Sequence, residues 1–376
     1  MVVPGSAVGV PVRARENVTV FLLCAGVGTH GMNGSWRYAV GLLSGFRSGT
    51  FIDSVRLIPE QVDRSSRRGR LRELRIVGSR ALFGLPGYAP LNVQPGRAVL
   101  HSVESVSVPG PRRVPIVVTA HDVCALLRPD LVSFRLGALK RLTWRRKHAW
   151  DAVIVPSAST RDDVLALGIR EERVVVIRHG LAPVFQDEPQ TKSLAWVESC
   201  VRMRPYVLVA SPPSLKKGSD VLLKTWSRVA RGTDMLLVWV GWDDEHARRL
   251  LPGASEFSRE SLMGLREVTD AQLVALYHRA QAVVVPSRYE GYSFCVTEAL
   301  SAGTPVVASD IPAHREFSSR AIHLFCQKDR DELADLLLSA FRGDLAREKV
   351  AFPTWEECAR SHAEVYKRVA FNANPG

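Results

Sequence analysis

The chain of 376 residues is long enough for two domains, and residues 1–190 hold 26 Lys and Arg against 15 Asp and Glu, which accounts for +11 of the formal net charge of +12. Its 46% hydrophobic and 23% charged residues are typical of a globular protein, and no window approaches the roughly 18 consecutive apolar residues of a membrane-spanning helix. The six cysteines are scattered and include no C-x2-C pair, which argues against a zinc site or a disulfide framework and favours free thiols in a reducing cytosol.

Short Val-rich runs predict buried strands, and helical patterns lie between several of them. Residues Met1–Pro11 lack the features of a secretion signal, and we expect a loose tail there. The predicted strands are Val18–Ala25, Val114–Thr119, Ala152–Val155, Val174–Ile177, Tyr206–Ala210, Met235–Val240, Ala282–Val285 and Val306–Ala308. This alternation predicts an α/β fold with two doubly wound parallel sheets, each covered on both faces. The polar segment Gln186–Pro205 is interpreted as the linker, which divides the chain into domains 1–189 and 190–354, and residues 355–376 are predicted to form a C-terminal helix.

The first strand is followed by Gly26, Gly28 and Gly31, which satisfy the G-x-G-x-x-G pattern of dinucleotide-binding loops. This pattern keeps an NAD(P)-dependent oxidoreductase open as an alternative function. Such an enzyme needs an acidic residue at the end of its second strand, whereas Asp53 lies inside the run Phe51–Leu57. The dinucleotide signal is therefore weak.

Two basic clusters lie in the first half, one from Arg64 to Arg75 and the other from Lys140 to Lys147. Either cluster alone is compatible with a solvated helix face. Together they favour a peripheral contact with an anionic membrane surface, where each basic residue contributes about 1 kcal/mol. Nucleic acid is not expected as a partner, because no nucleic-acid-binding motif accompanies the charge.

Candidate ligand-binding residues lie at the ends of two segments of the first half. His121 and Asp122 come directly after the predicted strand Val114–Thr119, at the carboxyl edge where open α/β sheets bind ligands. Asp122 is a candidate either for the acceptor side of the site or for holding the imidazole tautomer of His121. His101 ends the segment Arg97–His101 and is an equal candidate for the core and for the acceptor side of the site.

The second half opens with a segment suited to phosphate binding. Ser211 follows the strand Tyr206–Ala210, and Lys216 and Lys217 precede Gly218 at a predicted helix start. A lysine ammonium beside free backbone N–H groups is a sound site for a diphosphate, and we assign this role to Lys217. Asp243 and Asp244 lack a further ligand at metal-binding spacing, so we expect no metal site there.

The most informative stretch is Arg288–Pro305, in which Glu290 and Glu298 stand eight positions apart between two predicted strands. A helix is predicted from Thr297 to Ala302, which places Glu298 in its first turn. Carboxylates can hold the hydroxyls of a hexose and a ribose, while the N–H groups of a helix start favour the diphosphate between them. This combination suits a sugar nucleotide.

These residues resemble the glycosyltransferase group 1 family, whose members have the two-domain GT-B fold and an E-x7-E motif. The resemblance implies that Glu290 faces the transferred sugar, Glu298 the nucleotide ribose and His121 the donor hexose. It also implies donor contacts from Gly31 and Gly34 in the first loop, from Val268 to the base, and from the backbone of Ser293 and Phe294 to phosphate. The C-terminal helix is implied to pack back on the first domain.

Two departures from the family pattern affect the phosphate site. Ser211 stands where the family commonly has an Arg, and Ser293-Phe294-Cys295 replaces its usual Gly-Leu-Pro. Lys216 is a candidate to replace the missing charge, and a catalytically inactive GT-B partner protein stays open as an alternative.

The resemblance implies a retaining, metal-independent hexosyltransferase that needs no cofactor. Its expected partners are a GDP- or UDP-sugar donor and a saccharide or lipid-linked acceptor, and mannose from GDP-mannose is favoured by likeness to polysaccharide mannosyltransferases. We expect a role in cell-envelope polysaccharide or glycoconjugate biosynthesis. The expected location is the cytoplasm, at the inner face of the cell membrane.

Overall fold

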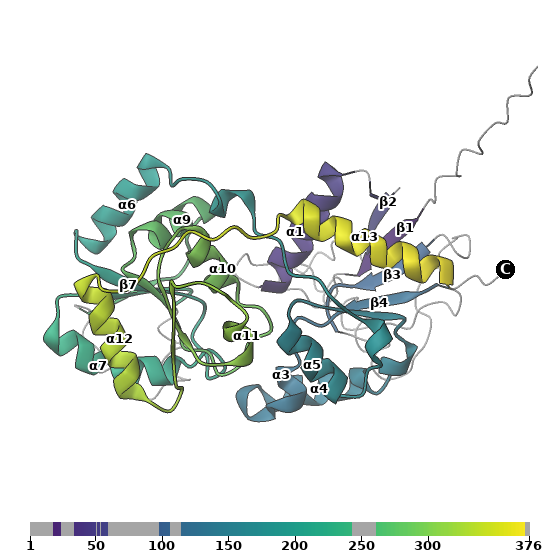
Figure 1. Cartoon of the computed structure of the whole chain (residues 1–376), viewed down its shortest axis with the longest axis horizontal. Helices are drawn as coiled ribbons and strands as arrows, with labels where there is room; N and C mark the ends of the chain where they lie inside the picture. The colour runs from purple at the N-terminus through teal and green to yellow at the C-terminus, as the bar shows by residue number, and fades with distance from the viewer. Residues whose placement is uncertain are drawn as a thin grey trace, which may run out of the picture.

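The computed structural model describes residues 18–23, 34–49, 51–52, 54–58, 98–105, 114–242 and 261–372. These residues form two lobes that lie side by side, each built around a parallel sheet (Figure 1). The predicted fold class, two Rossmann-like α/β halves, is confirmed.

The first sheet has the strand order β2-β1-β3-β4-β5-β6, and every neighbouring pair is parallel. Its strands are β1 (Thr19–Leu23), β2 (Ser54–Ile58), β3 (Ala98–Ser102), β4 (Ile116–Thr119), β5 (Ala152–Val155) and β6 (Val174–Val176). The helices of this lobe are α1 (Gly34–Ser48), α3 (Cys124–Leu127), α4 (Phe134–Trp144) and α5 (Ala158–Ala166). The strand order reverses between β1 and β3.

The second sheet has the order β12-β11-β10-β7-β8-β9, again fully parallel. Its strands are β7 (Tyr206–Ala210), β8 (Leu236–Val240), β9 (Leu262–Leu265), β10 (Ala282–Val285), β11 (Val306–Ser309) and β12 (Ile322–Phe325). The helices are α6 (Thr191–Val201), α7 (Ser219–Gly232), α9 (Asp270–Arg279), α10 (Phe294–Ser301), α11 (Pro312–Arg315) and α12 (Arg330–Arg342). The order reverses between β7 and β10, and ligands of open α/β sheets bind outside such a reversal.

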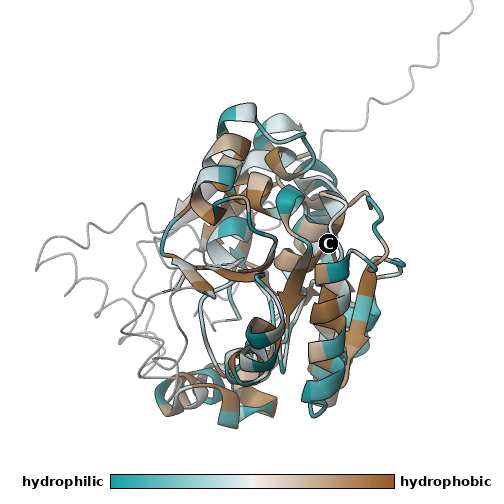
Figure 2. Cartoon of the chain, turned by 90° about the vertical axis from the view of Figure 1, so that its left-hand side faces the viewer, coloured by the Kyte–Doolittle hydropathy of each residue, from teal (hydrophilic) through white to brown (hydrophobic). Residues whose placement is uncertain are grey.

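The cores follow from the strand composition. Every residue of β4, β5, β8 and β10 is buried, as expected for strands covered on both faces. Figure 2 shows hydrophobic colour on the central strands, whereas the surrounding helices carry both hydrophobic and hydrophilic residues.

The C-terminal helix α13 (Trp355–Asn372) lies on the first lobe against α1, after the chain has crossed from the second lobe (Figure 1). Its apolar residues Trp355, Ala363 and Tyr366 are buried in the core of the first lobe. The helices approach closely at Gly41, where a Cβ would lie 2.0 Å from the Trp355 ring. A larger residue at position 41 would therefore separate α1 from α13.

The segment Gln186–Pro205, predicted as a linker, contains helix α6. Val197 and Val201 of α6 are buried in the core of the second lobe with residues of α9. The linker interpretation is wrong for residues 191–201, which form a helix of the second lobe that ends where Arg202 takes up a left-handed conformation with φ 51°. The polar residues Asp187, Glu188 and Gln190 precede this helix and are exposed.

Candidate active site

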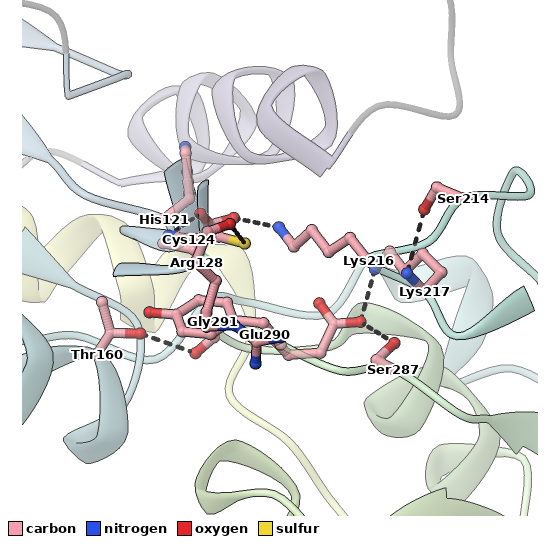
Figure 3. Close-up of polar contacts among 12 residues, drawn as sticks. His121, Cys124, Arg128, Thr160, Ser214, Lys216, Lys217, Ser287, Glu290 and Gly291 are labelled. Carbon is pink, nitrogen blue, oxygen red and sulfur yellow. Dashed lines mark hydrogen bonds and ion pairs between the residues drawn. The ribbon is translucent and has the colours of Figure 1, made fainter. Parts of the chain in front are cut away.

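Lys217 and Glu290 meet at the reversal of the second sheet. Lys217 follows β7 and Glu290 follows β10, and these two strands are neighbours in the sheet. The Nζ of Lys217 donates to Oε1 of Glu290 at 2.6 Å, and Ser287 Oγ donates to the same oxygen at 2.6 Å (Figure 3). The sheet topology therefore joins two residues that lie 73 positions apart in the sequence.

Glu290 is held as a carboxylate although it is only 8% exposed. Burial by itself opposes its charge, but the ammonium groups of Lys217 and Lys216 and two hydrogen bonds outweigh this effect and lower the pKa of Glu290. Glu290 is thus ionised at neutral pH. An entering ligand that offers an anion to Lys217 and hydroxyl donors to Glu290 satisfies both partners.

The loop before α7 presents Lys217 in a backbone arrangement that requires glycine next to it. Gly218 has φ +66°, and a Cβ there would lie 1.8 Å from the carbonyl oxygen of Pro286. The backbone N–H of Lys217 donates to Ser214 Oγ at 3.1 Å, which fixes the turn (Figure 3).

Helix α10 begins at Phe294, three residues earlier than predicted, and Glu298 therefore lies one turn inside the helix. Ser293 precedes the helix with φ 71°, a conformation that costs energy for any residue with a Cβ. Its Oγ is buried and has no hydrogen-bond partner in the described part of the chain. A strained residue with an unsatisfied hydroxyl, beside the free N–H groups of a helix start, is suited to an anionic ligand.

Glu298 is engaged by both lobes. Its Oε1 accepts from the Arg37 guanidinium of α1, and its Oε2 accepts from Tyr277 Oη at 2.7 Å. Burial raises the pKa of Glu298, while Arg37 and Tyr277 act in the opposite direction. The Glu298 carboxylate raises the pKa of Arg37, so the guanidinium remains charged.

His121 follows β4 and faces the second lobe. Its Nε2 lies 2.8 Å from the carbonyl oxygen of Val103, which can only accept, so Nε2 carries the proton. Burial lowers the pKa of His121, and its Nδ1 is therefore an acceptor for Nε2–H of His179 at 3.1 Å. Because protein partners hold both ring nitrogens, a contact of His121 with substrate would use its backbone or the face of its ring.

Asp122 does not hold the imidazole of His121. Its Oδ2 accepts from Lys216 Nζ at 2.5 Å, and its Oδ1 accepts from the backbone N–H of Cys124 at 3.0 Å. Burial opposes its charge, but Lys216 outweighs burial and lowers the pKa of Asp122 to about 2. The tautomer alternative is wrong because the Val103 carbonyl and His179 take that role, and Lys216 brings the second lobe to Asp122.

The two lobes also touch at Gly291. A Cβ at this position would lie 1.7 Å from the carbonyl oxygen of His121, so only glycine permits the contact. Thr160 Oγ1 donates to the carbonyl oxygen of Gly291 at 3.2 Å (Figure 3). Tyr292 Oη donates to the carbonyl oxygen of His179 at 3.0 Å. The segment around Glu290 is thereby fixed against the first lobe.

A cavity of about 320 Å³ lies between the lobes. Nine of the residues predicted for the site line it: Gly34, His121, Asp122, Ser211, Lys216, Lys217, Glu290, Ser293 and Phe294. Among the nine other lining residues, Arg37 and His179 carry nitrogen-bearing side chains that sequence reasoning did not assign to the site. Arg37 lies in the glycine-rich entry to α1, a segment already singled out, and its charge there was the available signal.

Three predicted residues are not among those that line this cavity. Glu298 lies behind Arg37, and Val268 packs against the core of the second lobe, so its contact with a base stays a prediction. Gly31, together with Gly26 and Gly28, lies outside the described residues, as do Arg64–Arg75, Asp243 and Asp244.

His101 is the third of these residues, and its acceptor-side role is corrected. It is fully buried behind the cavity, where its Nε2 lies 2.8 Å from Thr119 Oγ1 and its Nδ1 lies 2.7 Å from Tyr366 Oη. The segment before it is strand β3, which α13 covers, so the side chain belongs to the core.

The hydrogen bonds around His101 have one consistent direction. Burial lowers the pKa of His101 and His362, so both rings are neutral. His362 Nδ1–H must donate to a carbonyl, which leaves its Nε2 as an acceptor and fixes every remaining proton. Each residue donates to the next one in the chain. Tyr366 donates to His101, His101 to Thr119, Thr119 to Tyr38, Tyr38 to His362, and His362 to the carbonyl oxygen of Cys358.

Within the described ranges, no group of three or more His, Cys, Asp or Glu is placed to hold a metal ion. Over the same ranges, no helix combines the length and apolar character needed to cross a membrane.

Two parallel-sheet lobes with a cavity between them are the arrangement of the GT-B class of proteins. HepE of Anabaena in complex with UDP-glucose superposes with a TM-score of 0.61 at 16% identity, over 95% of this chain and 98% of that one. WaaG, a glycosyltransferase involved in lipopolysaccharide biosynthesis, gives a TM-score of 0.61 at 16% identity over 96% of this chain and the whole of WaaG.

Sequence comparison finds two glycosyltransferase family models in the chain. The model described as Glycosyl transferases group 1 matches residues 204–342, and the model described as Glycosyltransferase Family 4 matches residues 96–183. The phosphatidyl-myo-inositol mannosyltransferase of Mycobacterium leprae is 32% identical over 41% of this chain and 44% of its own length. The O-antigen chain mannosyltransferase B of Escherichia coli is 22% identical over 86% of this chain and 89% of its own. The chain therefore contains a glycosyltransferase group 1 domain at residues 204–342, preceded by a Glycosyltransferase Family 4 domain at residues 96–183.

Proposed function

We propose that this protein is a retaining glycosyltransferase that moves a hexose from a nucleotide sugar to a saccharide or lipid-linked acceptor. The observation that carries the proposal is the ion pair of Lys217 and Glu290 at the strand reversal, beside the unpartnered hydroxyl of Ser293. The pair offers a cation for a diphosphate and a carboxylate for sugar hydroxyls within one cavity.

In the proposed reaction, the bond between the anomeric carbon and the diphosphate oxygen breaks, and the electron pair leaves with the nucleoside diphosphate. The acceptor hydroxyl forms the new bond on the same face of the sugar and passes its proton to the departing phosphate oxygen. Lys217 and the N–H groups at the start of α10 stabilise the charge that grows on the diphosphate. Glu290 holds the sugar hydroxyls. In this proposal the Lys217 ammonium takes the place of a metal ion, and no cofactor enters the reaction.

Mannose from GDP-mannose is the favoured donor. The names of the two relatives from Mycobacterium leprae and Escherichia coli, both mannosyltransferases, support this choice. The UDP-glucose bound to HepE supports a nucleotide sugar as the class of donor.

The proposal is tested by titrating a panel of GDP- and UDP-sugars, with NADH as a competitor class, while the melting temperature is followed. We expect the largest rise with GDP-mannose, since a ligand at 100 times its Kd stabilises the folded state by about 2.7 kcal/mol. Stabilisation by NADH alone, with quenching of its fluorescence, would support the oxidoreductase alternative. Stabilisation by a sugar nucleotide without transfer to acceptor or hydrolysis by water would support the inactive partner protein.

The surface of helix α4 supports the proposal that the acceptor is carried by a membrane. Four large apolar side chains of this helix are exposed to solvent: Phe134 at 82%, Leu136 at 42%, Leu139 at 39% and Leu142 at 40%. Arg135, Arg141, Arg145 and Arg146 are exposed on or next to the same helix. Apolar side chains that enter the headgroup region, flanked by arginines, are suited to an anionic lipid surface.

The two lysines of the predicted basic cluster are occupied elsewhere. Lys140 donates to Ser105 Oγ at 3.0 Å, and Lys147 donates to the carbonyl of Leu167. The proposed membrane contact therefore depends on the arginines and on the apolar residues. The charge pattern alone did not identify the apolar residues.

Co-sedimentation with vesicles tests this contact. We expect binding to phosphatidylglycerol vesicles and not to phosphatidylcholine vesicles, and a loss of binding in Phe134→Ser. Met203→Ser is the matched control, because Met203 is 75% exposed on the other lobe. Equal binding of Phe134→Ser and the parent protein would refute the role of α4.

A further inference from the structure

Arg37 occupies an unusual position for a residue of the first lobe. It lies in the first turn of α1, yet its guanidinium reaches Glu298 of α10 and lies 3.6 Å from Asp270 of α9, and it stacks 5.3 Å from the centre of the Phe185 ring. Its three partners all come later in the sequence than the last strand of the first sheet. Arg37 therefore joins the lobes next to the proposed nucleotide site.

Arg37, and not Glu298, lines the cavity. The Glu298 side chain is 3% exposed, and its two oxygens are held by Arg37 and Tyr277. Because the Arg37 guanidinium already donates to Oε1, a ribose hydroxyl that donates to Glu298 competes with Arg37 for this carboxylate. This step rests on the proposed function, in which Glu298 holds the ribose.

The displaced guanidinium keeps only Asp270, which is 3.6 Å away and 65% exposed, so a second anion within the cavity would stabilise it. The cavity that Arg37 lines is shared with Lys216, Lys217 and Ser293, and the diphosphate of the donor is the anion that enters it. A guanidinium binds two phosphate oxygens at once, which an ammonium does not.

We propose that Arg37 is a nucleotide-binding residue that exchanges the Glu298 carboxylate for the donor diphosphate when the ribose hydroxyls bind Glu298. The first lobe thereby supplies a phosphate ligand to a site otherwise built by the second lobe. In the ligand-free cavity the Glu298 carboxylate balances the charge of the Arg37 guanidinium.

The test compares the affinities of GDP and guanosine by calorimetry, or of UDP and uridine if the protein prefers uridine nucleotides. In Arg37→Gln we expect diphosphate affinity to fall about 10- to 100-fold, the effect of one charge-assisted hydrogen-bonding group, while nucleoside affinity is unchanged or rises. Arg228→Gln is the matched control, because Arg228 forms ion pairs with Asp331 and Asp335 and does not line this cavity.

Other outcomes separate the two proposals. If Arg37→Gln raises both affinities equally, Arg37 only blocks Glu298 and the exchange is refuted, while the proposed function stands. If the parent protein binds no nucleoside diphosphate, the proposed function itself fails.

A second variant keeps the test independent of how well Arg37→Gln folds. Glu298→Gln retains the shape of the side chain but removes the charge that holds Arg37. We expect the affinity for inorganic pyrophosphate to rise about 10-fold in Glu298→Gln, and the rise to vanish in the double variant with Arg37→Gln. Unchanged or weaker pyrophosphate binding in Glu298→Gln would overturn the exchange.

Discussion

Lys217 Nζ and Glu290 Oε1 lie 2.6 Å apart, so each residue neutralises the other before any ligand binds. Loss of Glu290 leaves Lys217 free to bind a diphosphate. We therefore expect Glu290→Ala to reduce transfer by about 100-fold or more, because the sugar loses its positioning group, while nucleoside diphosphate affinity is retained or increased.

Glu290→Gln is the companion variant, since it removes the charge and keeps the shape. Initial rates of transfer and calorimetric titration with nucleoside diphosphate are the two measurements. A parallel loss of transfer and diphosphate binding in both variants would contradict the assigned role of Glu290.

The contact of Gly291 with the His121 carbonyl predicts a strong effect of one methyl group. Gly291→Ala places a Cβ where the oxygen now lies, and we expect a loss of stability of about 1–3 kcal/mol together with reduced transfer. Gly232→Ala is the control, because nothing lies within 4 Å of a Cβ there and alanine favours helix by about 0.5–1 kcal/mol. Urea unfolding measures both, and equal stabilities of the two variants would show that the lobes do not meet in this way.

At Ser293 we predict that one substitution raises the stability of the fold and lowers the affinity for nucleoside diphosphate. Because glycine adopts a positive φ without strain, Ser293→Gly is expected to stabilise the fold by about 1 kcal/mol, while loss of the hydroxyl lowers nucleoside diphosphate affinity about 10-fold. Met203→Gly has a comparable φ of 58° on an exposed residue of the second lobe and should gain stability without losing affinity. Thermal melts with and without nucleotide distinguish the two effects, and unchanged affinity in Ser293→Gly would leave the hydroxyl without a role in binding.

Buried histidines predict instability in mild acid. Burial lowers the pKa of His101, His121 and His179, and it lowers that of His362 to about 4. An unfolded imidazole binds a proton near pH 6.5, so between that pH and the folded pKa unfolding takes up protons and acid favours it. Each histidine then costs up to about 1.4 kcal/mol per pH unit below pH 6.5.

The measurement is the free energy of unfolding in urea at pH 7.5, 6.5 and 5.5. We expect a fall between the last two values, and a smaller fall in His362→Asn, whose amide can replace the donor to the Cys358 carbonyl without titrating. Constant stability down to pH 5.5 would mean that burial does not keep these imidazole rings neutral in the folded protein.

The strands were predictable because buried parallel strands are short, continuous and apolar. Ala152–Val155, Tyr206–Ala210 and Ala282–Val285 have the predicted bounds in the structure. Strand β12 was missed, because Ile322, His323 and Leu324 are only partly covered at an edge of the sheet and the sequence there is not uniformly apolar.

Sequence determined the local chemistry: a lysine before a glycine at a helix start, two glutamates eight positions apart, and polar residues directly after buried strands. These features depend on the order of neighbouring residues. The tertiary structure decided which groups face one another, because Arg37 and Glu298 are 261 positions apart and Lys216 and Asp122 are 94 apart. It also decided that His101 lies in the core, since α13 covers a strand more than 250 positions earlier, and no local pattern records such a contact.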